Sequence, residues 1–339
     1  MRIAVDAFGG DNAPDEIVKG SVQAVLNLNC EIILVGDETI LKNKLAQAGY
    51  SGSKITIQHA SEVIDGEDAP VDAVRHKKDS SMMVAFSLCK NGEADAVVSA
   101  GNTGAYFAGA FRVLGRIKGI RRPALTAFMP TVNNTKSVIM DVGANADCKP
   151  ENLEQFAQMG SLYAEKILGI QNPKVYLVNI GTEEHKGNEL SQKAHALMKE
   201  NKNINFCGNI ESRELTAGFA DVIICDGFTG NIILKAIEGT ASALFGLIKK
   251  SFMKTLATKI SALMMKPHIK ELKSMLDYSE YGGVPLLGID GVVIKAHGSS
   301  DAKAFENAVR SAVVFSETGL NADLKALYAQ QQDQDATKM

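Results

Sequence analysis

Short runs of β-branched and apolar residues alternate with amphipathic segments along most of the chain, and this alternation constrains the fold more than any other feature. The runs typical of strands are 2–7, 31–37, 54–60, 94–100, 136–143, 174–181, 220–227 and 291–298. Several are apolar at consecutive positions, as expected when both faces of a parallel sheet are covered. The clearest segments with helical spacing are 14–27, 79–90, 151–168 and 301–315. The pattern predicts βαβ units in a three-layer α/β/α fold.

The chain has no Pro-, Gly- or Ser-rich linker, so we expect one continuous α/β body over residues 1–329. No strand pattern occurs from Ile232 to about Ser279, where two or three helices are expected, with a helical protrusion around 244–280. The last residues, 330–339, form a polar tail that should fray.

Charge and composition exclude several classes of protein. The 339 residues include 36 Lys plus Arg and 39 Asp plus Glu, and a net charge of −3 excludes a globally basic nucleic-acid binder. Only 6% of residues are aromatic and none is Trp, which disfavours a surface for base stacking. We find no signal-peptide core and no uninterrupted apolar run of about 18 residues. The five cysteines are scattered without a CxxC pair, which indicates reduced thiols and no zinc site. We therefore expect a soluble, cytoplasmic protein.

Small polar residues follow six of the expected strands. These loops are 8–12, 101–104, 141–145, 181–187, 226–231 and 297–300. Glycines let backbone N–H groups converge, and a following helix adds its positive end, so loops of this kind bind anions such as phosphate. Because ligands of open α/β sheets bind at the carboxyl ends of the strands, we expect the six loops to line one cleft.

Each loop taken alone also fits a simple structural role, as a turn or a helix N-cap. The nucleotide-binding patterns GxGxxG after a strand and GxxxxGK[ST] are absent, and so are GxSxG and HExxH. Cys148 follows one loop and Cys225 ends a strand, but a strand-end cysteine is usually a small buried hydrophobe rather than a nucleophile. The cleft is therefore predicted more firmly than its ligand.

Eight segments, in this order, resemble those of the bacterial phosphate acyltransferase family. They are VDAFGGDNAP near the start, RHKKDSSM at 75–82, SAGNTGA at 99–105, MDVGANADCKP at 140–150, NIGTEEHKGNE at 179–189, DGFTGNIILKAIEG at 226–239, YGGVPLLGIDG at 281–291 and KAHGSSDA at 295–302. The resemblance covers residues 1 to about 320, and its main departure is Phe8, where Met is usual.

The resemblance implies a fold similar to phosphotransacetylases and isocitrate/isopropylmalate dehydrogenases, with intertwined subdomains, a mixed and largely parallel sheet, and a homodimer. It implies transfer of a long-chain fatty acyl group from acyl carrier protein to inorganic phosphate. The acyl phosphate product would feed a membrane glycerol-phosphate acyltransferase in phospholipid synthesis. No metal or organic cofactor is implied. Phosphate is already anionic at neutral pH, so such an enzyme supplies positioning and oxyanion donors rather than a catalytic triad.

The resemblance and the loop chemistry together suggest roles for individual side chains. Lys186 and Asn231 are expected to hold phosphate. Asn102 and Thr103 are expected to donate to the thioester oxygen, and His297 or His185 to protonate the departing thiolate. The residues expected to bind substrate around them, with the backbone N–H groups of 227–230 on the phosphate, are Gly101, Thr103, Gly104, Asp226, Gly227, Thr229, Gly230, Lys235, Gly298, Ser299 and Lys78. The loop aspartates Asp6, Asp11 and Asp226 accept hydrogen bonds only and are expected to organise loops.

Acyl carrier protein is strongly acidic, so its docking surface should be basic. The first candidate, which we call the Arg cluster, comprises Arg112, Arg116, Arg121 and Arg122 with Lys118. Arg75, Lys77 and Lys78 form the second candidate. A charge run is also common on an ordinary solvated face, and that alternative stays open.

Apolar residues recur at three- and four-residue steps in the helical region, and lysines flank the resulting stripe. Such a helix can lie in the interface of an anionic membrane, or it can pack on the core or on a dimer partner. We expect reversible membrane contact through 254–266. The stripe consists of Phe245, Ile248, Phe252, Leu256, Ile260 and Leu263, and the last four are the expected contact residues.

Two other functions fit the same sequence. One is a short-chain phosphotransacetylase that uses coenzyme A, for which a membrane helix would serve no purpose. The other is a non-catalytic scaffold that recruits carrier protein to the membrane, which the intact loops disfavour. Formation of acyl phosphate from long-chain acyl–carrier protein separates the three functions.

Overall fold

The computed structural model describes residues 1–133, 135–276 and 282–338, which divide into two compact units. Unit 1 contains 1–126, 162–171 and 282–338, and unit 2 contains 127–161 and 172–276. Two elements begin in one unit and end in the other, namely β5 (Ala124–Pro130) and α6 (Pro150–Leu168).

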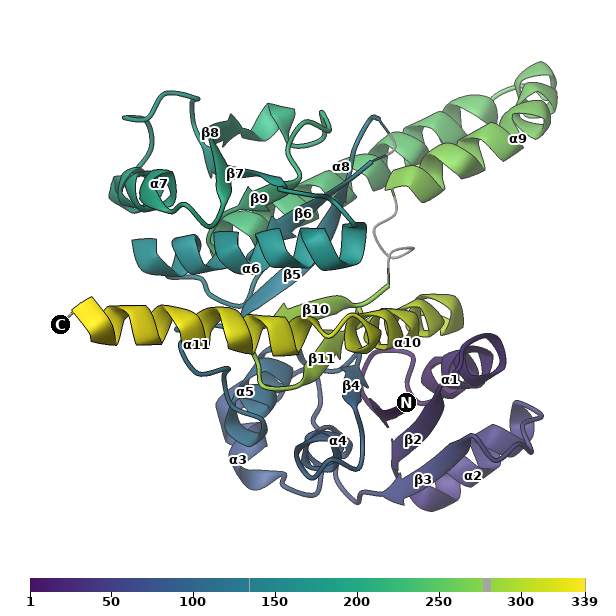
Figure 1. The fold of residues 1–339 in the computed structure, drawn as a ribbon. Helices are drawn as coiled ribbons and strands as arrows, with labels where there is room; N and C mark the ends of the chain where they lie inside the picture. Colours follow the sequence, from purple (N-terminus) through teal and green to yellow (C-terminus); the bar gives the residue numbers. More distant parts are fainter. Residues whose placement is uncertain (134, 277–281, 339) are drawn as a thin grey trace. The chain divides into compact units, whose positions relative to one another are not determined.

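Unit 1 alternates strands and helices through its N-terminal part (Figure 1). Its strands are β1 (Arg2–Asp6), β2 (Glu31–Gly36), β3 (Ile55–His59), β4 (Ala96–Ser99), β10 (Val284–Leu287) and β11 (Val292–Lys295). Its helices are α1 (Asp15–Asn27), α2 (Glu38–Gln47), α3 (Pro70–His76), α4 (Ser81–Lys90), α5 (Thr103–Val113), α10 (Ala302–Glu317) and α11 (Leu320–Lys338). The strand order is β3-β2-β1-β4-β11-β10-β5. The first five are parallel, and β10 is antiparallel to both of its neighbours.

Helices cover both faces of the unit 1 strands, with α4 and α5 on one side and α10 on the other (Figure 1). Tyr106 of α5 is fully buried, and its hydroxyl donates to the main-chain oxygens of Val97 and Ile294, each at 2.9 Å. On the other side, a Cβ atom at Gly20 of α1 would lie 2.6 Å from the Ala302 oxygen, so α1 and α10 pack backbone to backbone. The two Tyr106 bonds link α5 to β4 and β11, the strands from which two of the predicted loops emerge.

Unit 2 carries the second set of loops. Its strands are the second half of β5, β6 (Lys136–Met140), β7 (Lys174–Asn179), β8 (Asn205–Glu211) and β9 (Val222–Ile224), in the order β5-β6-β9-β7-β8. Its helices are α7 (Glu189–Glu200), α8 (Gly227–Phe252), α9 (Leu256–Leu276) and a short 3₁₀ turn, η1 (Ser212–Glu214), besides the first part of α6. The strands β6, β9, β7 and β8 are parallel.

All eight predicted strands are present, and the mixed, largely parallel arrangement with flanking helices confirms the predicted fold class. The sequence reading missed β5, β8 and β10. The segment 330–338 lies within helix α11, where we expected a frayed tail.

The helices α8 and α9 pair as a hairpin that extends from the rest of unit 2 (Figure 1). The apolar stripe expected on one helix is divided between the two, because α8 ends at Phe252 and α9 begins at Leu256. The Thr255 hydroxyl accepts from the Thr258 N–H at 3.2 Å and so caps the new helix. Residues 277–281, the end of the predicted protrusion, lie outside the described residues.

By length and composition α8 is apolar enough to cross a membrane, and none of its most apolar stretch is buried in the structure. Lys235 and Glu238 interrupt the apolar run, so no uninterrupted run stands out in the sequence. The buried residues of this helix are Gly227 and Gly230, both in its first turn.

Candidate active site

Three predicted loops leave one edge of unit 2. β9 lies between β6 and β7, and the three strands are parallel. Because the carboxyl ends of parallel strands share an edge, the loops 141–145, 181–187 and 226–231 follow three neighbouring strands there. The loops 8–12, 101–104 and 297–300 follow the neighbouring parallel strands β1, β4 and β11 of unit 1. A cleft shared by all six stays a prediction.

Asp226 fixes the residue at which α8 begins. Its carboxylate accepts from the Thr229 N–H at 2.8 Å and from the Thr229 hydroxyl at 2.9 Å, as an N-cap does. The Gly227 N–H donates to the main-chain oxygen of Asn145 at 2.8 Å. This bond ties the first turn of α8 to the loop after β6, and Asp226 therefore has the organising role that we predicted.

Asp141 holds the loop after β6. Its fully buried carboxylate accepts from three successive N–H groups, of Gly143, Ala144 and Asn145, at 3.2, 3.0 and 2.7 Å. Gly143 has a φ of +137°, which favours glycine, and a Cβ atom there would lie 3.7 Å from the Asn231 Oδ1. The Asn231 side chain therefore lies beside this loop.

The loop after β7 carries Lys186 and His185. The Asn179 Nδ2 donates to the main-chain oxygen of Lys186 at 3.1 Å, and its Oδ1 accepts from the Ile180 N–H at 2.9 Å. Lys186 is half-buried, with its aliphatic stem against Gly181, whereas His185 is exposed. The sequence reading did not single out Asn179, although an Asn at the end of an apolar strand is a signal for such a loop.

The backbone at the start of α8 differs from the prediction. We expected the N–H groups of 227–230 to bind phosphate, but Gly227 donates to Asn145, and Thr229 and Gly230 donate to Asp226. The Asp226 carboxylate occupies the helix N-terminus that an anion would otherwise use. The side chains of Asn231 and Lys186 are therefore better candidates for binding phosphate, and the exposed Lys235 lies one turn further along α8.

The thiols of the two cysteines near these loops donate to main-chain oxygens. The Cys225 thiol donates to the Asp141 oxygen at 3.5 Å, and the Cys148 thiol to the Asn145 oxygen at 3.6 Å. Burial, followed by the nearby carboxylates of Asp141 and Asp226, raises the pKa of the Cys225 thiol well above its usual value. A protonated thiol is a poor nucleophile. In the described ranges of the chain, His, Cys, Asp and Glu side chains do not gather in threes as metal ligands do.

In unit 1, Asp6 organises the loops. Its buried carboxylate accepts from the Ser81 hydroxyl at 2.5 Å and from the Ser99 hydroxyl at 2.6 Å. Burial raises the pKa of Asp6, and the two hydroxyls oppose that rise. A Cβ atom at Gly9 would lie 2.4 Å from the Asp6 Oδ2, so the loop after β1 depends on glycine there.

The loops after β1 and β11 are bonded to each other. The Asp11 N–H donates to the Gly298 oxygen at 2.8 Å, and the Asn12 Nδ2 donates to the oxygens of Ser299 and Ser300 at 3.2 and 3.3 Å. These bonds join residues almost 290 positions apart in the sequence and fix the loop that carries His297.

Lys295 is a buried cation that the sequence reading overlooked. Its side chain lies at the end of β11 with 6% exposure and donates to the Ala296 oxygen. Burial lowers its pKa to about 8, although the negative charges of Asp6 and Asp11 act to raise it. A lysine directly after three apolar strand residues was the available signal.

Asn102 does not have the role that we predicted. Its Oδ1 accepts from the Ala105 N–H at 3.0 Å and caps α5. Its Nδ2 lies 3.3, 2.9 and 3.2 Å from the main-chain oxygens of Asp65, Gly66 and Asp68. Both amide protons are engaged by these carbonyls, so none is left for a thioester oxygen. The exposed Thr103, in the first turn of α5, remains the candidate donor from this loop.

His297 is exposed at the start of the loop after β11. Its Nδ1 accepts from the Ser299 N–H at 3.2 Å and lies 2.8 Å from the Ser299 hydroxyl. With Nδ1 as acceptor, the proton of the neutral ring lies on Nε2. The same loop also precedes Asp301, which caps α10 by accepting from the Ala304 N–H at 2.8 Å.

The two basic clusters differ in character. The four arginines of the Arg cluster are exposed, and the Arg116 guanidinium stacks over Phe111, 5.4 Å from the ring centroid. In the other cluster, Lys77 forms ion pairs with Asp68 at 2.5 Å and with Asp65 at 3.8 Å, which neutralise it. Lys78 is exposed. The Arg cluster is therefore the better candidate for an acidic partner.

The predicted membrane residues lie at the α8–α9 hairpin. Leu256, Ile260 and Leu263 of α9 are 79%, 62% and 71% exposed, and Phe252 of α8 is half-buried. These exposures are high for large apolar side chains and are typical of a surface that contacts a partner or a lipid.

Comparison with known proteins connects this geometry to a family. The family model described as "Fatty acid synthesis protein" matches residues 1–323. A phosphate acyltransferase of Alkaliphilus oremlandii is 55% identical over 315 residues, which cover 93% of each chain. A phosphate acyltransferase of Clostridioides difficile is 50% identical over 317 residues, which cover 94% of this chain and 93% of that one.

The fold also occurs in solved structures of more distant proteins. A phosphotransacetylase from Streptococcus pyogenes matches with a TM-score of 0.64 and 18% identity, covering 94% of both chains. A branched-chain phosphotransacylase from Enterococcus faecalis matches with a TM-score of 0.60 and 14% identity, covering 93% of this chain and 99% of that one. At these identities the likeness concerns the fold alone. The two relatives found by sequence are 55% and 50% identical over 93% and 94% of this chain. The chain therefore belongs to the fatty acid synthesis protein family and is an acyltransferase of the phosphate acyltransferase kind.

Proposed function

We propose that this protein transfers a long-chain fatty acyl group from acyl carrier protein to inorganic phosphate and releases acyl phosphate for phospholipid synthesis. The observation that carries the proposal is the loop cluster of unit 2, where Asn231 and Lys186 lie at the carboxyl ends of neighbouring parallel strands. An amide donor and an ammonium group suit a phosphate that itself attacks the substrate.

The chemistry needs little from the protein beyond placement. A phosphate oxygen attacks the thioester carbon, the tetrahedral oxyanion collapses, and the carbon–sulfur bond breaks to give acyl phosphate and a thiolate. Positioning contributes up to about 7–11 kcal/mol to such a step. His185, beside Lys186 on the same loop, is our candidate for protonating the thiolate, and His297 of unit 1 is the second candidate.

The carrier protein would dock on the Arg cluster. This cluster begins at the C-terminal end of α5, a helix of 11 residues whose N-terminal end lies in the 101–104 loop. At 1.5 Å per residue, α5 separates the start of the Arg cluster from this loop by about 16 Å. The long prosthetic arm of an acyl carrier protein suits such a separation between docking surface and reacting thioester.

The protein would act in the cytoplasm and contact the membrane reversibly. Leu256 and Ile260 project from α9 into solvent, with Lys259 between them. Apolar side chains with lysine neighbours suit the interface of an anionic bilayer. Contact there would deliver the hydrophobic acyl phosphate to a membrane glycerol-phosphate acyltransferase.

A homodimer would explain the exposure of α8. Phe228, Ile232 and Leu247 of this helix are 63%, 50% and 66% exposed, with the small residues Gly239 and Ala243 on the same face. A second copy of the chain is the occupant that we propose for this face. Light scattering should give twice the chain mass, and Leu247→Glu should shift the mass toward one chain; a wild-type protein of single-chain mass would contradict the proposal.

One assay separates this function from the two alternatives. The protein is incubated with radiolabelled phosphate and either palmitoyl–acyl carrier protein or acetyl–coenzyme A, and the labelled product is identified. We expect palmitoyl phosphate from the first substrate. Acetyl phosphate alone would indicate a coenzyme A-dependent phosphotransacetylase, and the absence of any acyl phosphate would indicate a scaffold.

A further inference from the structure

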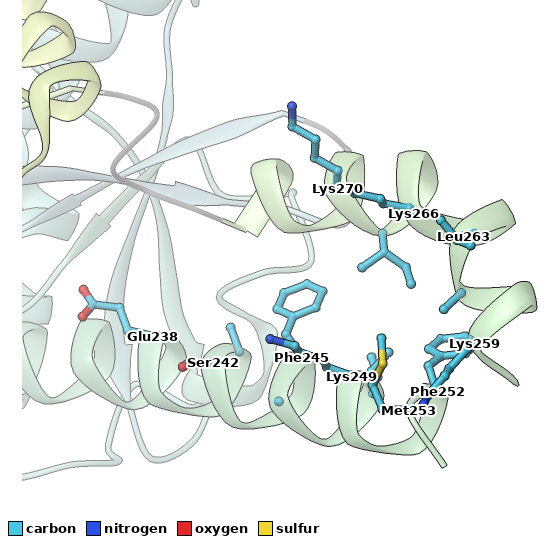
Figure 2. Close-up of a pocket in the computed structure, with 15 residues that line it drawn as sticks. Glu238, Ser242, Phe245, Lys249, Phe252, Met253, Lys259, Leu263, Lys266 and Lys270 are labelled. Carbon is cyan, nitrogen blue, oxygen red and sulfur yellow. The ribbon is translucent and has the colours of Figure 1, made fainter. Parts of the chain in front are cut away.

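A groove with a volume of about 770 Å³ lies between α8 and α9, within unit 2 (Figure 2). Its apolar lining includes Ala241, Phe245, Ile248 and Phe252 from α8 and Ala262 and Leu263 from α9. Figure 2 shows Phe245 pointing from α8 toward α9. Pockets of roughly 300–1,000 Å³ with mostly apolar walls are typical of small-molecule sites.

The groove lies on the same face of α8 as the candidate phosphate ligand. Asn231, Glu238, Phe245 and Phe252 are spaced by seven residues, and seven residues bring a helix back to within about 20° of the same direction. The last three of these residues line the groove. A molecule bound along this face would therefore run from the phosphate loop directly into the groove.

The order of polarity along this face matches one class of ligand. The face begins with the polar side chains of Asn231, Lys235 and Glu238 and continues with Ala241 and Phe245. A fatty acyl group attached to a carrier or to phosphate has the same order, with a polar head followed by an alkyl chain. The helix thus presents the donors Asn231 and Lys235 near the head, and apolar side chains from Ala241 onward to the distal part of the alkyl chain.

The lengths also agree. Seven residues separate Asn231 from Glu238, which is about 10 Å along the helix, and Phe245 is about 21 Å from Asn231. An extended alkyl chain advances about 1.3 Å per carbon, since single carbon–carbon bonds of about 1.5 Å alternate in direction. A chain of about eight carbons with its carbonyl near Asn231 ends where the groove begins, and one of about sixteen carbons reaches Phe245.

Four lysines contribute to the lining of the groove. Lys249 comes from α8, and Lys259, Lys266 and Lys270 come from α9. All four are exposed, so their aliphatic stems can cover an alkyl chain while their ammonium groups stay in water. An apolar chain is thereby shielded from solvent without any unpaired charge being buried.

We propose that the groove between α8 and α9 binds the distal part of the fatty acyl chain, beyond about the eighth carbon, and so sets the preference for long-chain substrates. This inference rests on the proposed function for the identity of the head group. The groove also protects the alkyl chain of the acyl phosphate before its release.

The kinetic test compares palmitoyl– and hexanoyl–acyl carrier protein. Each buried methylene strengthens binding about fourfold, so filling the groove should penalise the long chain selectively. Ala241→Trp should lower the palmitoyl-to-hexanoyl ratio of kcat/KM at least tenfold. Leu244→Trp, at an exposed position of the same helix that does not line the groove, is the matched control and should leave the ratio unchanged. A ratio that Ala241→Trp leaves unchanged would overturn the proposal.

A binding test does not depend on catalysis. The chain contains no Trp, so Phe245→Trp introduces a single fluorophore into the groove. Dibromostearate, whose bromines quench a tryptophan that they touch, should quench Phe245→Trp and leave Leu244→Trp bright. The groove is not an acyl site if both variants are quenched equally or if neither is quenched. It is also not an acyl site if quenching of Phe245→Trp disappears at protein concentrations at which the chain self-associates. If acyl phosphate never forms yet Phe245→Trp is quenched, the proposed function fails and the acyl site stands.

Discussion

A Cβ atom at Gly230 would lie 1.9 Å from the main-chain oxygen of Asp141. The first turn of α8 and the loop after β6 therefore meet at a distance that only glycine permits. Asn231 follows directly in the chain, so this close approach also places its amide beside Gly143.

Gly230→Ala should disrupt this junction. The added methyl group must displace either α8 or the 141–145 loop, and overpacking of this kind costs about 1–3 kcal/mol. We expect a lower midpoint in urea unfolding and a loss of phosphate-dependent turnover. Gly239→Ala, in the same helix but with open space around its Cβ position, is the control and should unfold at the same midpoint or a higher one.

Burial of Lys295 predicts a specific pH dependence of stability. Its folded pKa of about 8 lies below the unfolded value, so the unfolded chain binds the extra proton between these pKa values. The contribution of Lys295 to the free energy of unfolding should therefore increase as the pH rises through that interval.

The measurement compares wild type with Lys295→Met by urea unfolding. From about pH 7.5 to about pH 9.5, the free energy of unfolding of the wild type should rise by about 2 kcal/mol relative to that of the variant. A constant difference between the two proteins across this interval would show that Lys295 is not a buried, strained cation.

Membrane contact through α9 depends on exposed apolar side chains. Leu256→Glu should abolish flotation with vesicles of anionic phospholipid, because a charge at this position opposes insertion into the interface. Val132→Glu changes an equally exposed apolar residue elsewhere in unit 2 and should float as the wild type does. Flotation that survives Leu256→Glu and Ile260→Glu together would place the contact elsewhere.

Carrier-protein docking on the Arg cluster predicts a selective change in KM. Arg112→Glu with Arg122→Glu should raise the KM for palmitoyl–acyl carrier protein about tenfold or more, since like charges across an interface repel. The KM for phosphate should not change. Lys19→Glu with Lys42→Glu, at two exposed lysines of unit 1, changes the net charge by the same amount and is the control. Equal effects of the two charge reversals would contradict docking at this cluster.

The sequence predicted the elements whose signal is local. The central strands β1, β4 and β11 have continuous apolar runs, and the loops after them have Gly, Asn and Ser at the expected places. The missed strands lack such runs: β10 has four residues including Pro285, and β8 contains Gly208 with a φ of +106°.

The misassigned roles depend on contacts between distant residues. Asn102 resembled a free donor, but its amide is engaged by carbonyls some 35 positions earlier in the chain. The N–H groups at the start of α8 resembled an anion site, but Asn145 and Asp226 already accept from them. The break between α8 and α9 had a local signal in Thr255, which caps the second helix.

The central claim is that Lys186 and Asn231 bind the attacking phosphate, and one measurement tests it most directly. The rate of labelled palmitoyl phosphate formation is followed as phosphate is varied, for wild type, Lys186→Ala, Asn231→Ala and the control Lys42→Ala, a surface lysine of unit 1 paired with Glu38. We predict that the first two variants fold but lose at least a hundredfold in kcat/KM for phosphate, with the control unchanged. Near-wild-type values for both Lys186→Ala and Asn231→Ala would contradict the account.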